Sequence, residues 1–161
     1  LQSLFDLEKD FTFESFEQAW AALLWVLEVE DTQKFLKHWK TSRQFAKQVQ
    51  DLLSILALRE EGELGKRDCY RFDLNLLLQA ENLRRAQGKE VNPQAITETY
   101  ESLTIHDKKE MQINGGILIK EYGYHPGPEL GDVLEEIEYA IVDGNLDNEV
   151  EAIHAYLRER K

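Results

Sequence analysis

Apolar residues recur every three to four positions through most of this chain, and that spacing limits the folds open to it. The first clear example is SFEQAWAALLWVL, in which Phe16, Trp20 and Leu24 lie on one helical face. Ser15 and Gln18 form a capping box at the start of this helix. No segment alternates as a half-buried strand does, and no internal repeat is visible. The pattern predicts an all-α chain of about eight or nine short helices.

Capping residues and helix breakers place the remaining helices. In chain order the signals are Asp31 or Thr32 as a cap, a break at Thr41-Ser42, Gly88 as a stop, Asn92-Pro93 as a start, Gly123 and Gly144 as stops, and Asp147 or Asn148 as the last cap. The polar segment ESLTIHDKKE is typical of a junction between domains. We therefore expect a helical body domain at residues 1–104 and a small helical tail domain at residues 105–161.

Length and composition exclude several classes of protein. With 161 residues, 42% of them hydrophobic, the chain can build one core or two small ones. No apolar run approaches the roughly 18 residues of a membrane span, and no signal-peptide region is present at the N-terminus. The single cysteine, Cys69, excludes an internal disulfide, as expected in a reducing cytosol. We expect a cytoplasmic globular protein without membrane association. The absence of an initiator Met is compatible with a piece of a longer protein.

The sequence motifs of common catalytic centres are absent. The four histidines form no H-x-H or H-E-x-x-H pair, which disfavours a zinc site. There is no Walker loop, no G-x-S-x-G motif and no D-x-D pair that could hold two metal ions. Cys69 has no recognisable histidine partner, so a structural role is favoured over a nucleophilic one. We expect no catalytic residue, no metal site and no cofactor in this chain.

Charge is distributed unevenly along the sequence. The net charge of −12 disfavours a general nucleic-acid binder. However, screening over about 8 Å lets a local basic patch act independently of distant acids. Residues 121–161 hold eleven acids and three bases, whereas residues 34–50 hold no acid and five bases. These five candidate phosphate-binding residues are Lys34, Lys37, Lys40, Arg43 and Lys47. A solvated helix face is the alternative, and the break at Thr41-Ser42 leaves open whether Lys40 shares a face with Arg43 and Lys47.

The segment GYHPGPELGDVL is a rigid entry from a loop into a helix. Backbone between Gly127 and Leu130 lies at the start of that helix, where its N–H groups, which Pro128 lacks, can attract a phosphate. Glu129 and Asp132 in the first turn would compete with such an anion. A helix-hairpin-helix module uses the similar pattern G-x-x-P-G-x-x-x-G. A tight corner between two helices explains the segment equally well.

The C-terminal third of the chain resembles a known family. The matching features are ING, GYxPGPELGxxLxxIExAIxxG and LxNExEAIxxYL, which together extend over residues 113–157. They closely resemble the C-terminal end of bacterial class II CCA-adding enzymes, the tRNA nucleotidyltransferases of Bacillus-like bacteria. The upstream helices resemble the body domain of the same enzymes less specifically. One departure is Ile117, which stands where family members often carry an acid.

The resemblance implies an all-helical body and tail that hold tRNA, the body along the acceptor stem and the tail toward the elbow. It implies that the metal-binding acids, with their Mg²⁺, and the residues that select CTP or ATP lie in a head outside this chain. The chain alone is then expected to be inactive. Further RNA contacts are expected at Lys108, Lys109 and Lys120 beside the tail loop. A homodimer is compatible with this interpretation.

Two other functions remain open at this point. A helix-hairpin-helix module would prefer duplex DNA to tRNA. A protein-interaction module would use the acidic tail helix to bind a basic partner.

Overall fold

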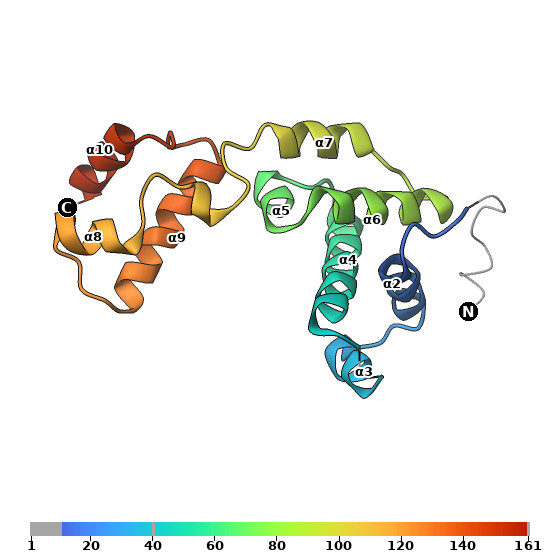
Figure 1. The fold of residues 1–161 in the computed structure, drawn as a ribbon. Helices are drawn as coiled ribbons and strands as arrows, with labels where there is room; N and C mark the ends of the chain where they lie inside the picture. Colours follow the sequence, from blue (N-terminus) through green and yellow to red (C-terminus); the bar gives the residue numbers. More distant parts are fainter. Residues whose placement is uncertain (1–10, 40, 161) are drawn as a thin grey trace. The chain divides into compact units, whose positions relative to one another are not determined.

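The computed structural model describes residues 11–39 and 41–160, which form two compact units (Figure 1). The described part of the first unit comprises residues 11–39, 41–64 and 72–98, and that of the second comprises residues 65–71 and 99–160. Nine α-helices and one 3-10 helix, and no strand, occur within these described ranges. The predicted all-α fold class is confirmed. None of the helices in the described ranges is both long and apolar enough to cross a membrane.

The first unit is built around its longest helix. Its helices are α2 (Phe16–Val26), α3 (Thr32–His38), α4 (Arg43–Glu61), α6 (Leu74–Ala86) and the first part of α7 (Pro93–Glu101). Helix α4 packs against α2, α3 and α6. Leu24, Leu36, Leu52 and Leu77 are at most 1% exposed between these helices. Burying each such side chain contributes about 1.5–3 kcal/mol, which is what holds the bundle together.

The second unit combines one short upstream helix with the C-terminal third of the chain. Its elements are α5 (Lys66–Arg71), the end of α7, η1 (Lys108–Glu110), α8 (Gly115–Tyr122), α9 (Pro128–Val142) and α10 (Val150–Arg160). Helices α5 and α8 both pack against α9. Leu118, Ile137, Ile141 and Ile153 are at most 1% exposed and form its core.

The two units differ from the predicted ranges 1–104 and 105–161 in two places. The division falls between residues 98 and 99, inside α7, and residues 65–71 belong to the second unit. Helix α5 joins the second unit because Arg67 forms an ion pair with Asp143 at 2.7 Å and Tyr70 donates a hydrogen bond to Glu138. Such pairings over long sequence distances leave no local signal. As a division into domains, the predicted ranges stay a prediction.

Several helices begin where the predicted caps or breaks indicate. The side chain of Asp31 accepts from Lys34 N at 2.9 Å, and that of Ser42 accepts from Phe45 N at 3.1 Å. These bonds satisfy N–H groups that have no partner within their own helix. The predicted cap of α10 at Asp147 or Asn148 is wrong. The helix begins at Val150, and Asn148 instead bonds to the backbone of residues 110 and 112.

The predicted capping box at Ser15 is only half formed. Ser15 Oγ accepts from Gln18 N at 3.0 Å, but Oε1 of Gln18 accepts from Glu14 N at 2.7 Å instead of returning to the Ser15 backbone. The buried amide of Gln18 also donates to the Gln79 carbonyl at 2.8 Å, which ties α2 to α6. The side chain thus serves both the cap and the packing of two helices.

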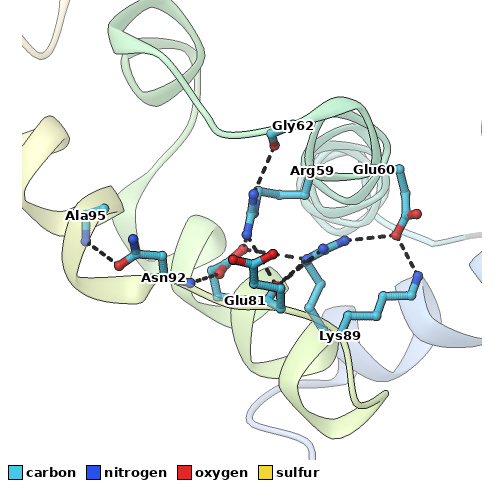
Figure 2. A network of polar contacts seen from close by, with 9 residues as sticks. Arg59, Glu60, Gly62, Glu81, Lys89, Asn92 and Ala95 are labelled. Carbon is cyan, nitrogen blue, oxygen red and sulfur yellow. Dashed lines mark hydrogen bonds and ion pairs between the residues drawn. The ribbon is translucent and has the colours of Figure 1, made fainter.

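A buried ion pair joins α4 to α6 (Figure 2). Arg59 Nε donates to Oε1 of Glu81 at 2.6 Å, and Oε2 of Glu81 accepts the N–H of Asn92 at 2.9 Å. Arg59 is 8% exposed and Glu81 is fully buried. Arg59 also donates to the Gly62 carbonyl at 2.9 Å. The pair therefore holds both the end of α4 and the loop before α7.

Three further charged side chains extend this network toward the surface (Figure 2). One carboxylate oxygen of Glu60 accepts from Arg84 at 2.8 Å and from Lys89 at 2.6 Å. The Lys89 hydrogen bond, aided by the charges of both bases, holds the pKa of Glu60 below its usual value. The guanidinium groups of Arg59 and Arg84 also reach the Glu90 carbonyl at 3.3–3.4 Å. The loop at residues 87–92 is therefore fixed on the α4–α6 pair.

Candidate nucleic-acid interface

A groove of about 590 Å³ lies in the first unit where α3 is followed by α4. It is lined by Gln33, Lys37, Thr41, Ser42, Arg43, Ala46, Lys47, Gln50 and Asp51, and we name it the α3–α4 groove. Three of the five cations predicted between residues 34 and 50 line it, namely Lys37, Arg43 and Lys47. The break at Thr41-Ser42 brings the end of one basic helix next to the start of another.

The electrostatics of the α3–α4 groove favour an anion. Helix α4 has 19 residues and carries no acid in its first turn, so its N-terminus adds about half a positive charge. Among the described residues that line the groove the one acid is Asp51, and it pairs with Lys47 at 2.8 Å. Because the Lys47 side chain is 75% exposed, this pair is weak and its lysine can exchange partners. The groove therefore keeps a positive balance of three cations to one acid.

The other two predicted cations of this stretch are placed differently. Lys34 is exposed on α3 but does not line the α3–α4 groove. Lys40 lies outside the residues that the structure describes. Both stay predictions as phosphate-binding residues.

The start of α9 has the open geometry expected of the proline-rich loop. Gly127 is the N-cap and forms no side-chain cap, Pro128 is the first helical residue, and residues 125–129 are exposed. Glu129 lies in the first turn, as the sequence indicates. Leu130 is half-buried, and its Cδ2 would lie 3.4 Å from a Cβ built on Gly115, so its side chain packs on α8. At Leu130 only the backbone remains a candidate for phosphate contact.

The conformations of the two glycines in this loop predict responses to alanine of different size. Gly123 ends α8 at φ 73° and ψ 19°, the left-handed region, whereas Gly127 has φ 162° and ψ −174°, extended backbone open to any residue. Neither position has an atom within 4 Å of an added Cβ. Gly123→Ala should lower the free energy of unfolding by about 1–2 kcal/mol, and Gly127→Ala by less than about 0.5 kcal/mol. Urea unfolding followed by far-UV circular dichroism measures both, and equal effects would contradict the assigned loop conformation.

The remaining predicted lysines do not form a single cluster. Lys108 Nζ lies 3.7 Å from Oε2 of Glu138, a carboxylate that also accepts from Tyr70. Burial, and then this hydrogen bond, raise the pKa of Tyr70. Lys109 and Lys120 are exposed, on η1 and α8 respectively. Lys108 would have to release Glu138 before it could bind a phosphate.

The second unit carries an acidic groove of about 450 Å³; the sequence analysis noted the acidic tail helix but not this groove. It is lined by Arg67, Asp132, Glu135, Glu136, Tyr139, Ala140, Asp143, Asn145 and Tyr156. Arg67, the one base among the described lining residues, donates to both carboxylate oxygens of Asp143 and lies 4.8 Å from the centre of the Tyr139 ring. Arg67 thereby lowers the pKa of Asp143. The spacing of the acids at positions 132, 135, 136 and 143 on one helix could have revealed this face. The negative charge of this groove would repel a polyanion such as a nucleic acid.

The side chains that could support catalysis are separated or buried. Cys69 is fully buried in α5, and burial raises the pKa of its thiol to about 11, so the thiol is neutral at physiological pH. Among the described residues no group of three or more His, Cys, Asp or Glu side chains could hold a metal ion. Within the first unit the α3–α4 groove is thus the surface whose chemistry suits phosphate, and within the second unit the candidate is the start of α9.

Comparison with known proteins gives matches over most or all of the chain. Residues 11–157 match the family model described as tRNA nucleotidyltransferase domain 2. The whole chain is 81% identical to the CCA-adding enzyme of Streptococcus pneumoniae and 55% identical to that of Streptococcus gordonii, and covers 40% of each. A crystal structure of the Bacillus stearothermophilus CCA-adding enzyme in complex with CTP superimposes with a TM-score of 0.80 at 29% identity, over 92% of this chain and 38% of that one. The chain therefore spans about 40% of the length of its curated relatives.

Proposed function

The chain belongs to the tRNA nucleotidyltransferase domain 2 family and corresponds to the helical body and tail of bacterial class II CCA-adding enzymes, and on this premise we propose that it holds tRNA. The whole enzyme would add CCA to the tRNA 3′ end from CTP and ATP, with Mg²⁺ and the reacting groups in a head outside this chain. A cytoplasmic location and a homodimer both stay predictions.

The observation that carries this proposal is the α3–α4 groove. Lys37, Arg43 and Lys47 come together there beside a helix N-terminus that carries no acid. Lysine, arginine and helix N-termini bind the phosphates of nucleic acids without reading their bases. A-form RNA is recognised largely by backbone and shape, since its major groove is too narrow for side chains. The groove therefore suits the ribose-phosphate backbone of a tRNA.

The role we assign to the chain is positional. Three or four phosphate contacts give affinities of roughly 10⁻⁴ to 10⁻⁶ M at physiological salt. When they are linked to a head that also binds the tRNA, the same contacts act at a high effective concentration. The acidic groove on α9 would repel RNA that approached the second unit from that side. In this role the chain would hold the acceptor stem and elbow of the tRNA while the 3′ end enters the active site in the head.

A competition experiment separates this proposal from the alternatives. Labelled tRNA bound to the chain should be displaced by unlabelled tRNA more effectively than by a DNA duplex of equal phosphate content, at moderate salt. The chain alone should incorporate no CMP or AMP into a tRNA that lacks CCA. Preference for duplex DNA would favour a helix-hairpin-helix module. Absence of RNA binding at every salt concentration would contradict the proposal and favour a protein-interaction module.

A further inference from the structure

We propose that Trp39 is a stacking platform for an unpaired base of an RNA whose phosphates occupy the α3–α4 groove. This inference rests on the proposed function and assigns that site an additional contact. The proposed ligand is then not only the ribose-phosphate backbone of an RNA. It is an RNA with an accessible base next to the phosphates in the groove.

Trp39 is a large aromatic side chain that the fold leaves open to solvent. It is 61% exposed, although it follows directly after the last residue of α3. Its ring centre lies 6.4 Å from that of Trp20 and 6.3 Å from that of Phe35, in tilted arrangements. The ring of His38 is perpendicular to it at 6.2 Å. The indole is therefore supported by other rings while much of its surface remains free. A side chain supported in this way loses little rotamer entropy on binding.

The position of Trp39 links this free surface to the α3–α4 groove. Lys37 and Thr41, two residues before and two residues after it, both line the groove. The backbone N–H of Trp39 bonds to the carbonyls of Lys37 and Phe35, which fixes the main chain of Trp39 at the end of α3. Trp39 itself does not line the groove, but one short stretch of chain carries both its exposed indole and the groove-lining Lys37 and Thr41.

The chemistry of this pair of features favours a nucleotide over an apolar partner. A purely apolar protein surface would have to desolvate Lys37 or Arg43 without compensation, which is unfavourable. A single-stranded nucleotide offers phosphates for the cations and an aromatic face for the indole. Stacking of a base on an aromatic side chain tolerates any sequence, because every base has such a face. Unpaired RNA is therefore the ligand class that meets both requirements.

The test compares two substitutions in the full 161-residue chain. Trp39→Leu keeps an apolar contact with Trp20 and Phe35 but removes the aromatic face, whereas Trp39→Phe keeps an aromatic ring. The ligands are a blunt RNA hairpin whose loop is replaced by a non-nucleotide linker, so that it has no unpaired base, and the same hairpin with an unpaired 3′ extension. Trp39→Leu should weaken binding of the extended hairpin by about 5- to 150-fold and leave the blunt hairpin within twofold of the unmodified chain. Trp39→Phe should retain most of the affinity.

The salt dependence and a matched control distinguish stacking from charge. The slope of log K against log salt should be the same for Trp39→Leu and the unmodified chain, because indole carries no charge. Phe16 is 82% exposed on α2, and no residue within two positions of it lines the groove, so Phe16→Ala should bind both hairpins normally. Equal binding of the extended hairpin by Trp39→Leu and the unmodified chain would overturn this inference and leave the proposed function standing. Failure of the unmodified chain to bind either RNA would overturn both.

Discussion

Replacing Glu81 with alanine is expected to destabilise the first unit by about 3–5 kcal/mol. The side chain is fully buried, and it accepts from Arg59 at 2.6 Å and from the N–H of Asn92 at 2.9 Å. Its removal leaves a buried guanidinium without its carboxylate and a backbone donor without a partner (Figure 2). Because both partners in the ion pair are desolvated, removing one of them lowers the free energy of unfolding far more than removing an exposed ion pair would.

The three tryptophans make this prediction measurable in one unit. Trp20, Trp25 and Trp39 all belong to the first unit, so their fluorescence during urea unfolding reports that unit alone. Arg85→Ala is the matched control, since Arg85 is an exposed residue on the same helix as Glu81. It should change the free energy of unfolding by no more than about 0.5 kcal/mol. An effect of Glu81→Ala below about 1 kcal/mol would show that the pair is not desolvated as described.

Neutralising the α3–α4 groove is expected to remove most of the salt dependence of RNA binding. The variant is Lys37→Gln, Arg43→Gln and Lys47→Gln together. Each lost phosphate contact lowers the slope of log K against log salt by about 0.7–0.9. The variant loses three such contacts. A rise from 50 to 200 mM salt should therefore lower the RNA affinity of the unmodified chain by roughly 20- to 40-fold more than that of the variant. Fluorescence anisotropy with labelled tRNA at four salt concentrations measures both slopes.

A charge-matched control separates a local site from the effect of net charge. Lys66, Arg85 and Arg158 are exposed and lie outside the α3–α4 groove. Replacing these three residues with glutamine changes the net charge by the same amount and should leave the slope within about 0.5 of its original value. If the slope of log K against log salt falls by the same amount in both triple variants, RNA binding depends on overall charge and the groove is not the binding site.

Local signals predicted the helices well. The apolar spacing and the caps at Asp31 and Ser42 are properties of a few neighbouring residues, and the helices begin where these residues indicate. The cap predicted for α10 failed because Asn148 uses its amide to bond to the chain around residue 111, 36 to 38 positions away. Long-range partners of this kind are invisible in a local pattern.

The candidate site was predicted only in part for the same reason. The basic stretch was evident, but the break at Thr41-Ser42 left it open which cations share a surface. The structure brings Lys37, Arg43 and Lys47 to one groove across that break and leaves Lys34 outside it. The pairing of Lys108 with Glu138 and the buried pair of Arg59 with Glu81 also depend on tertiary packing. Residue type and spacing predicted that the surface is basic, whereas tertiary packing determines which of the basic residues line it.

The most direct test of a tRNA-holding surface is an amide chemical-shift titration of the isotope-labelled chain with tRNA at moderate salt. The account predicts the largest changes at Lys37, Trp39 and the residues from 41 to 47, with smaller changes at Gly127 to Leu130. The acidic groove on α9 should be unaffected. Changes concentrated on that acidic groove, or no change along the α3–α4 groove at saturating tRNA, would contradict it.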